Sequence, residues 1–176
     1  MQRKIETGAR RQRAIRIGFL LMSAAAILFY SISAPAAKDL ATIGYIEEVV
    51  LLPWGIKLPA RVDTGASMTS LDARDIVVKQ KKVTFKLPED FGEQEYDLPI
   101  VRYGNVTSSM GIQERPVVEL ELCVGTTKFK VLVNLNDRSA VKYPLIIGRN
   151  LLRREFLVDP GKRHLQPPAC PGLRPK

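Results

Sequence analysis

Apolar and polar side chains alternate along most of the chain between Thr42 and Val158. The runs 56–62, 83–87 and 117–124 carry apolar residues at every second position, and most of the residues between them are charged or polar. A period of two is typical of β-strands that bury one face and leave the other in solvent. Turn-forming residues separate the runs, so we expect an all-β domain over residues 43–160.

The same pattern gives approximate positions for the elements. We expect strands or turns in the following order: a β-rich run over 43–52 with broken alternation, strands over 56–62 and 79–87, a long hairpin over 98–121, a strand over 129–135, an apolar strand over 144–148, one short helix within 149–154, and a last strand over 156–159. Residues 38–42 are interpreted as a linker. The Pro-rich basic tail over 161–176 is expected to be extended or disordered because its composition cannot form a core.

A segment without charges precedes the domain. Residues 17–37 carry no charged side chain, and residues 1–16 carry six basic residues against Glu6, a net of +5. A helix of 21 residues spans roughly 30 Å, the thickness of the bilayer interior. We therefore expect a single N-terminal transmembrane helix that inserts into the lipid bilayer, with a basic cytoplasmic tail before it.

The alternative is a signal peptide cleaved near Ala34-Pro35-Ala36. We favour an uncleaved anchor, because the apolar core from Ile17 to Ile32 is longer than usual and Pro35 falls inside the cleavage site. The anchor predicts a bacterial inner-membrane protein with its C-terminal domain in the periplasm. Cleavage would instead release the domain into the periplasm.

Charge and cysteine content limit the functions that the protein could have. The formal net charge is +9, of which +5 lies in residues 1–16, so the remainder carries only +4. No dense basic stripe is interleaved with aromatic residues, so we expect no nucleic-acid partner. Cys123 and Cys170 could pair in an oxidising compartment, or Cys123 could be a small buried residue while Cys170 stays free.

Candidate chemistry gathers in two short stretches. Asp63-Thr64-Gly65-Ala66 follows the strand over 56–62, and alone it could be an ordinary Asx-type turn. The stretch 145–152 begins 82 residues later and reads Leu-Ile-Ile-Gly-Arg-Asn-Leu-Leu. An Asp-Thr-Gly turn followed at that distance by an apolar strand, a glycine and a short helix is far rarer than either stretch alone.

Together these stretches resemble the retropepsins, the single-domain aspartic proteases of retroviruses and their cellular relatives. The runs 115–118, 136–138, 143–144 and 156–159 further resemble a bacterial retropepsin-like family often described as "putative ATP-dependent zinc protease". The resemblance implies a closed barrel with one short helix. It also implies an aspartic endopeptidase in which two Asp63 carboxylates, one from each subunit of a homodimer, activate a water against a peptide bond.

The resemblance also assigns roles to neighbouring residues. Support of the active-site loop falls to Thr64, Gly65, Ala66, Ile146, Ile147, Gly148 and Arg149. A flap that closes over an extended peptide or protein substrate is expected around Tyr103, Gly104, Asn105 and Gly111. The family pairs the arginine after the glycine with an aspartate at the position that Ser67 occupies here, so Arg149 needs another partner, with Asp72 and Asp75 as candidates.

Two further expectations concern cofactors and the alternative function. The chain has no Walker loop and no His-Glu-x-x-His, and His164 stands alone, so we expect no metal site and no cofactor. The alternative function is a catalytically inactive retropepsin-fold domain that binds a peptide or regulates a partner without cutting it.

Overall fold

The computed structural model describes residues 39–52, 54–92, 94–108 and 111–172. The contacts divide the chain into two units after Lys38, and the described residues all belong to the second unit. The expected basic tail and the anchor or signal peptide over 1–37 lie outside the described residues. Within the described part, no helix has the length and hydrophobicity needed to cross a membrane.

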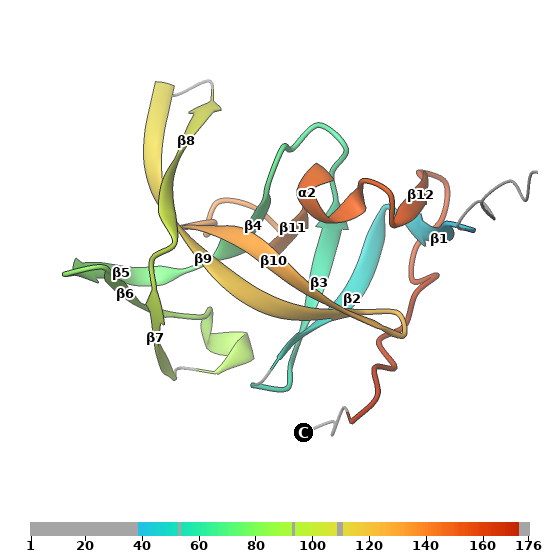
Figure 1. The fold of residues 1–176 in the computed structure, drawn as a ribbon, viewed down its shortest axis with the longest axis horizontal. Helices are drawn as coiled ribbons and strands as arrows, with labels where there is room; N and C mark the ends of the chain where they lie inside the picture. Colours follow the sequence, from blue (N-terminus) through green and yellow to red (C-terminus); the bar gives the residue numbers. More distant parts are fainter. Residues whose placement is uncertain (1–38, 53, 93, 109–110, 173–176) are drawn as a thin grey trace, which may run out of the picture. The chain divides into compact units, whose positions relative to one another are not determined.

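The described residues form strands, one short α-helix and one 3-10 helix (Figure 1). In chain order they are β1 (Ala41–Gly44), β2 (Ile46–Leu52), β3 (Ile56–Val62), β4 (Thr69–Asp72), β5 (Arg74–Lys79), β6 (Lys82–Lys86), η1 (Glu89–Phe91), β7 (Glu95–Pro99), β8 (Arg102–Ser108), β9 (Gly111–Val124), β10 (Thr127–Asn136), β11 (Leu145–Ile147), α2 (Arg149–Leu152) and β12 (Phe156–Asp159). The expected all-β domain with one short helix is confirmed.

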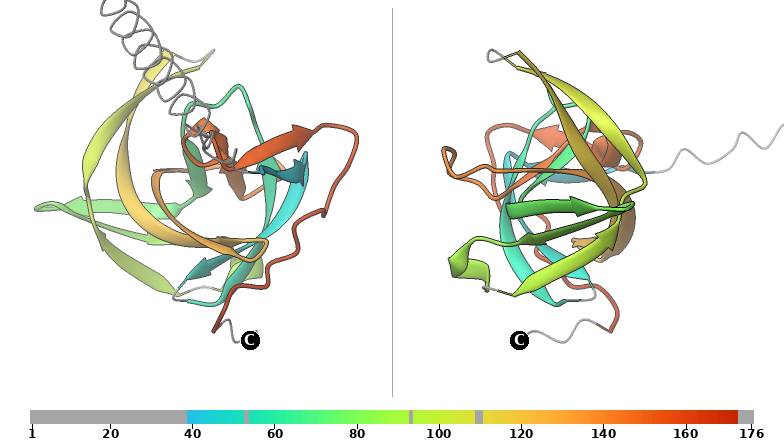
Figure 2. Two further views of the ribbon diagram at one scale, coloured as in Figure 1. Left: turned by 45° about the vertical axis from the view of Figure 1, so that its right-hand side comes forward. Right: turned by 90° about the vertical axis from the view of Figure 1, so that its left-hand side faces the viewer.

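The largest sheet bends back on itself. Its order is β10-β4-β11-β3-β2-β9-β8, and β9 pairs with β10 as well as with β2 and β8. Two smaller sheets, β1-β12 and β5-β6-β7, complete the domain. The β8–β9 hairpin curves away from the rest of the large sheet in both views of Figure 2. It therefore stands apart from the strands that carry the two chemical stretches.

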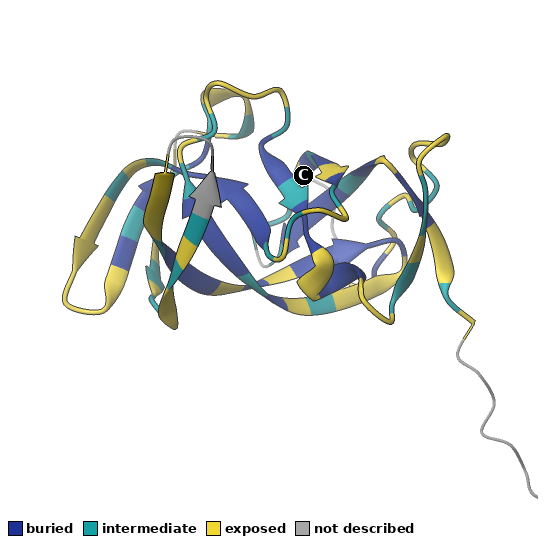
Figure 3. Ribbon diagram, turned by 90° about the horizontal axis from the view of Figure 1, so that it is seen from above, coloured by how far each residue is buried: buried dark blue, intermediate teal, exposed yellow. Residues whose placement is uncertain are grey.

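The core follows the alternation in the sequence. In β3, Leu58 and Ala60 are fully buried while Lys57 and Arg61 are exposed. Along β9 the side chains of Glu119 and Glu121 are exposed between buried neighbours. Buried positions run through the middle of the strands, and exposed ones gather at the hairpin ends (Figure 3). Burial of one face per strand stabilises the fold through the hydrophobic effect.

The sequence pattern missed the strands β4, β5 and β7 and merged β1 with β2. The expected run over 43–52 is two strands, because β1 pairs with β12 while β2 pairs with β3 and β9. Strand β4 was not expected, although all four of its residues are buried. The expected strand over 79–87 contains β6 and the turn at Gln80-Lys81, where both φ angles are positive, whereas β5 before that turn was not expected.

Candidate active site

Asp63 lies directly after β3, at the start of a tight loop. Its backbone N–H donates to the carbonyl oxygen of Ile147 at 3.0 Å, which fixes the loop to β11. Its Oδ1 accepts hydrogen bonds from the backbone N–H groups of Gly65 at 2.9 Å and Ala66 at 3.2 Å. Within the described residues, Oδ2 has no hydrogen-bond partner, and the side chain is only half-buried. One oxygen is thus held by the loop, and the other is available.

Arg149 holds this loop from the other side. Its Nη1 donates to the carbonyl oxygens of Thr64 at 2.9 Å and Gly65 at 2.7 Å. Its backbone N–H donates to the carbonyl oxygen of Ala66 at 2.9 Å. The two chemical stretches of the sequence are therefore joined by direct contacts. The candidate partners Asp72 and Asp75 were wrong, because Asp72 pairs with Arg74 and Asp75 pairs with Lys86.

Gly148 allows the two stretches to approach so closely. A Cβ atom at this position would lie 2.6 Å from the carbonyl oxygen of Met68 and 2.8 Å from the backbone nitrogen of Thr69. Both distances are shorter than real Cβ contacts, and the obstructing atoms belong to the backbone. The glycine is required here by space, since its φ of −93° is one that any residue can adopt.

A buried polar network lies beneath the loop. Asn150 Oδ1 accepts from the N–H and the hydroxyl of Thr69, and that hydroxyl lies 3.2 Å from the backbone nitrogen of Gly148, which donates to it. Ser70 Oγ donates to Asn134 Oδ1, and Asn134 Nδ2 donates to the carbonyl oxygen of Thr69. Every buried side chain in this set has a partner, so the network rigidifies the loop support.

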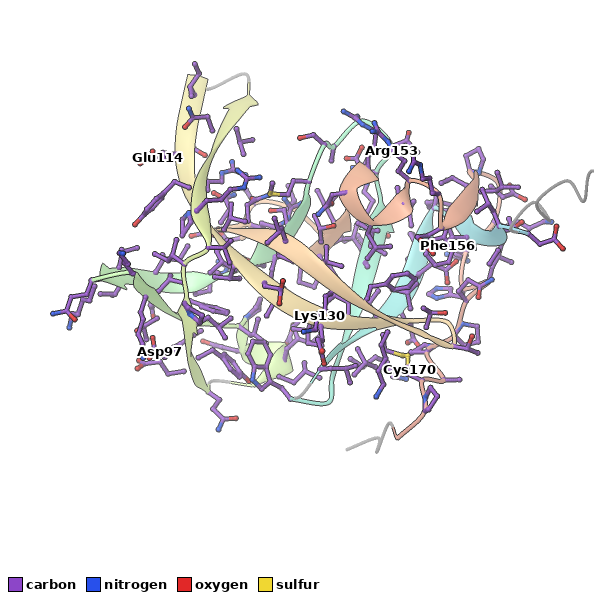
Figure 4. The ribbon with its side chains drawn as sticks, viewed as in Figure 1. Asp97, Glu114, Lys130, Arg153, Phe156 and Cys170 are labelled. Atoms are coloured by element: carbon purple, nitrogen blue, oxygen red, sulfur yellow. A yellow bond between two sulfur atoms is a disulfide. The ribbon has the colours of Figure 1, made fainter. Side chains whose placement is uncertain are left out.

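The flap candidates lie on the β8–β9 hairpin. Tyr103 pairs with Pro116, Gly104 with Arg115 and Asn105 with Glu114 in the antiparallel register. Glu114 is seen on this hairpin in Figure 4. Tyr103 and Asn105 are exposed, and Gly111 begins β9 with a φ of 108°. Thus the structure places all four flap candidates on one hairpin.

A groove of about 510 Å³ opens between this hairpin and the Asp63 loop. The residues that line it are Gly65, Ala66, Ser67, Met68, Ser70, Asn105, Val106, Arg115, Asn134, Arg138, Ile146 and Arg149. Ile146 faces the groove, whereas Ile147 is fully buried beneath the loop. Among the flap candidates only Asn105 lines the groove. Tyr103, Gly104 and Gly111 lie elsewhere on the hairpin.

Three arginines that line the groove, Arg115, Arg138 and Arg149, concentrate positive charge there. Arg138 is half-buried, and burial lowers its pKa; the positive charges of Arg115 and Arg61 lower it further, while Asp72 and Asp63 act in the opposite direction. Burial also lowers the pKa of Arg115. Arg115 donates to Gln113 and Asn134, but its Nε is buried without a hydrogen-bond partner among the described residues. The groove is therefore suited to an anionic group.

The sequence did not mark four residues of the groove as site residues: Arg115, Arg138, Ser70 and Asn134. Arg115 and Arg138 fall in the runs 115–118 and 136–138, which carry the family resemblance but give no reason for a cation. Ser70 and Asn134 sit on β4 and β10, which pair side by side in parallel. That pairing brings together residues 64 apart in the chain, so local pattern could not reveal it.

The remaining predicted site residues are the cysteines. The structure joins Cys123 and Cys170 by a disulfide with 6.0 Å between their Cα atoms. Among the described residues, no three His, Cys, Asp or Glu side chains are grouped so that they could hold a metal ion. A larger hollow of about 730 Å³ beside Arg74, Lys86 and Asp137 contains none of the predicted catalytic residues.

An Asp-Thr-Gly loop tied to an Ile-Ile-Gly-Arg strand and helix, in a mostly β domain, defines a retropepsin-like protein. A family model described as "Retropepsin-like aspartic endopeptidase RimB" matches residues 42–169, more than half of the chain. The chain therefore belongs to the RimB-like family. The resemblance seen in the sequence is confirmed, and with it the retropepsin-like fold.

Solved structures include two similar proteins. A protein of unknown function from Legionella pneumophila subsp. pneumophila strain Philadelphia 1 is 30% identical with a TM-score of 0.61, over 72% of this chain and 98% of that one. The protease of simian foamy virus (mac) is 20% identical with a TM-score of 0.35, over 59% of this chain and 87% of that one.

A curated relative is a longer protein. The chain is 31% identical over 130 residues to a protein of Parasynechococcus marenigrum (strain WH8102) named a probable alpha-L-glutamate ligase. The match covers 67% of this chain but only 28% of that relative. The similarity thus concerns one part of the relative.

Proposed function

We propose that the protein is an aspartic endopeptidase whose active site is completed by two copies of the chain. The observation that carries the proposal is the state of the Asp63 loop. Oδ1 of Asp63 is held by two backbone N–H groups, while Oδ2 has no partner within the described residues. Thr64, the next residue, is exposed, and its hydroxyl likewise has no hydrogen-bond partner there. A second copy would supply both partners across a two-fold axis.

Peptide-bond hydrolysis at this site would depend on two Asp63 carboxylates that lie very close to each other. Two Asp63 side chains a few ångströms apart cannot both ionise, so they share one proton. The ionised carboxylate takes a proton from a bound water as the water oxygen bonds to the peptide carbonyl carbon. The protonated carboxyl donates its proton to the carbonyl oxygen, giving a neutral tetrahedral intermediate. The newly protonated carboxyl then gives its proton to the leaving nitrogen, while the other carboxylate takes the proton of a hydroxyl of the intermediate as the C–N bond breaks, so the pair again shares one proton.

The β8–β9 hairpin would bind the substrate on one side of the groove. An extended peptide bound in the groove would lie between the Asp63 loop and the Asn105–Val106 segment of β8. Backbone groups of an edge strand can hydrogen-bond such a peptide as an added strand. We therefore assign the β8–β9 hairpin as the flap, with Asn105 and Val106 as its contact residues.

The arginines suggest the kind of side chain that the groove accepts. Arg115 has a buried, unpartnered Nε, and Arg138 is half-buried among other cations. An acidic substrate side chain would satisfy that donor and lower the repulsion between the guanidinium groups. The curated relative is named for glutamate, which agrees with this preference. We propose peptides with Glu or Asp beside the cleaved bond as the preferred substrates.

We also propose that the protein is anchored in the inner membrane. The uncharged segment over 17–37 and the basic tail before it support a single-pass inner-membrane anchor, with the domain on the extracytoplasmic side. The disulfide agrees with that side, because disulfides persist in oxidising compartments. Both copies of the dimer would then be tethered to one membrane, which raises their effective concentration.

A second candidate is a domain that binds acidic peptides without cutting them. The observation in its favour is the curated relative, in which a region similar to this chain forms 28% of a longer protein named as a ligase. Such a region could hold a glutamate-containing peptide for chemistry performed elsewhere in the relative. The arginine-lined groove would then act without Asp63.

Cleavage of peptides by the full chain in detergent micelles tests the proposal. The library should contain matched peptides that differ only by Glu against Gln, and products should be identified by mass spectrometry from acid to neutral pH. Asp63→Asn keeps the Oδ1 acceptor for Gly65 and Ala66 but cannot complete the dyad. We expect it to lower kcat by about 10³-fold or more while the peptide still binds.

A mixing experiment tests the two-copy site. With total protein fixed and half of it Asp63→Asn, randomly exchanged dimers should retain about one quarter of the wild-type activity, because only wild-type pairs have two carboxylates. Retention of three quarters would show that one Asp63 per dimer suffices, and retention of one half would show that each copy works independently. Peptide binding without any cleavage by wild-type dimers would favour the second candidate.

A further inference from the structure

The residues after β12 fold back along the domain as a strap, defined here as Lys162–Cys170. The N–H of Tyr45 donates to the carbonyl oxygen of Lys162, and the N–H of His164 donates to that of Ile46, both at 2.8 Å. Gln166 Nε2 donates to the carbonyl oxygen of Thr42 at 2.8 Å. The strap therefore binds β1, the first strand of the described domain, and the start of β2.

Glu47 is the centre of these contacts. It is fully buried in β2, and its carboxylate accepts hydrogen bonds from the N–H groups of Gly44, Leu165 and Gln166. The first donor lies at the end of β1, and the other two lie in the strap. A buried carboxylate needs such donors, because burial of an unpaired charge is costly. Release of the strap would remove two of the three donors.

Two glycines show that the strap is fitted closely to the domain. A Cβ atom at Gly44 would lie 2.5 Å from the carbonyl oxygen of Lys162. A Cβ at Gly125, where φ is 57°, would lie 2.6 Å from Oε1 of Gln166. Backbone and strap thus meet at van der Waals distance on both sides of Glu47.

The far end of the strap is held covalently. The N–H of Ala169 donates to the carbonyl oxygen of Gly125 at 2.7 Å, and Cys170 is bonded to Cys123 near the end of β9. Figure 4 shows this bond at the end of the domain where β9 turns into β10. Val50, Cys123 and Cys170 form a small buried cluster of their own. The disulfide therefore closes a strap whose other contacts are hydrogen bonds.

We propose that the strap is a clasp that closes by oxidation over β1 and Glu47. In thiol–disulfide exchange, one of the two thiolates attacks a donor disulfide, such as a protein disulfide oxidant of the compartment, and forms a mixed disulfide. The second thiolate then displaces the donor as a dithiol, which receives the two electrons and the two protons. The reduced chain has an open clasp, with β1 held by its pairing with β12, by the hydrogen bond from Gly44 to Glu47 and by the buried side chain of Ile43. A two-stranded sheet is marginally stable by itself.

The clasp goes beyond the proposed protease activity and does not depend on it. Strand β1 is where the chain from residues 1–38 enters the domain. Closure in an oxidising compartment would therefore secure that junction only after the domain has reached the compartment. Reducing conditions would loosen it while the large sheet stays folded.

Limited proteolysis of the full chain in detergent micelles tests the clasp. Trypsin should cut after Lys162 and Arg163, which belong to the strap, and after Lys79, Lys81 and Lys82, which lie at the distant β5–β6 turn. Reduction with dithiothreitol should raise the cleavage rate at the strap by about tenfold or more, while the rate at the β5–β6 turn stays the same. Cys170→Ser should give the reduced pattern without any reductant.

Glu47→Gln tests the hydrogen-bonded part of the clasp. It should speed cleavage after Lys162 and Arg163 even with the disulfide intact, because the amide N–H₂ group faces backbone donors. Glu48→Gln is the matched control, since Glu48 is partly exposed and its one partner within the described part of the chain is Lys57. Unchanged strap cleavage after reduction and in Cys170→Ser would overturn the proposal. An equal rise at the β5–β6 turn would also overturn it, by showing that the disulfide supports the whole domain.

Discussion

Arg149 donates a hydrogen bond from Nη1 to the carbonyl oxygen of Gly65 over 2.7 Å, although the two residues are 84 apart in the sequence. The same nitrogen reaches the carbonyl oxygen of Thr64 at 2.9 Å. Arg149 thus binds backbone oxygens of the Asp63 loop, where the sequence led us to expect a carboxylate partner. The arginine therefore holds the loop through its backbone oxygens.

Replacement of Arg149 by alanine should therefore disorder the Asp63 loop. The carbonyl oxygens of Thr64 and Gly65 would lose a charged donor, and we expect a loss of about 1–3 kcal/mol in the free energy of unfolding. We also expect kcat to fall more than KM rises, since the loop positions the carboxylates. Urea unfolding and peptide kinetics measure both. Arg153→Ala is the control, because Arg153 is exposed just after α2 (Figure 4) and should change neither.

Gly148→Ala should be among the most damaging small substitutions in the chain. The added methyl group would meet the carbonyl oxygen of Met68 at 2.6 Å, so backbone must move. We expect a loss of about 2–3 kcal/mol or more in stability. Gly161→Ala provides the comparison, since its Cβ would meet only the Asp159 carboxylate oxygen at 3.3 Å. Equal thermal stability of the two variants would contradict the close approach.

Charge selectivity should depend on the arginines of the groove. Arg138→Gln removes one cation that lines the groove, and Arg115→Gln removes another. For matched Glu and Gln peptides, either substitution should lower the ratio of kcat/KM values by about tenfold, because a charge-assisted hydrogen bond is lost. Lys142→Gln removes the same charge from an exposed position outside the groove and should leave the ratio unchanged. A general loss of activity with an unchanged ratio would argue against acidic substrates.

The sequence was sufficient for elements that have a strong local signal. Strand β3 has the bounds expected from alternation, and the Asp63 loop and the Ile146–Arg149 stretch follow from their motifs. Strand β5 gave no such signal, because Val77 and Val78 are both exposed and its register with β6 is irregular. Alternation predicts a strand only where one face is buried.

The groove was harder to predict for a different reason. Ser70 and Asn134 meet because β4 and β10 are parallel neighbours, a pairing between segments that are far apart in the chain. Their side chains are buried polar groups, which local patterns treat as surface residues. Likewise, nothing near Arg138 predicts that its side chain lies half-buried beside other cations. Long-range pairing decides these positions, and a single sequence does not encode it in any local window.

Acid should weaken the contacts of Asp137, which lies next to Arg138 in the chain. Asp137 Oδ1 accepts a hydrogen bond from the N–H of Ser139 and lies 3.1 Å from Arg74 Nη1. These contacts, the backbone N–H of Ser139 first, lower the pKa of Asp137 below its ordinary value. A carboxyl group whose pKa is lower in the folded state contributes stability above its unfolded pKa, near about 4, and loses it as the pH falls through the folded value.

Asp137→Asn should therefore flatten the acid side of the stability profile. The amide oxygen can still accept from Ser139, but it no longer titrates, so urea midpoints should fall less between about pH 4 and pH 2 than in wild type. The effect should be small, because Asp137 is exposed and solvent screens its charge. Asp97→Asn, on β7 (Figure 4) and paired with Lys82, removes an exposed carboxylate far from this loop and is the control. If both variants keep the wild-type acid slope, the contacts of Asp137 do not stabilise the loop that carries Arg138.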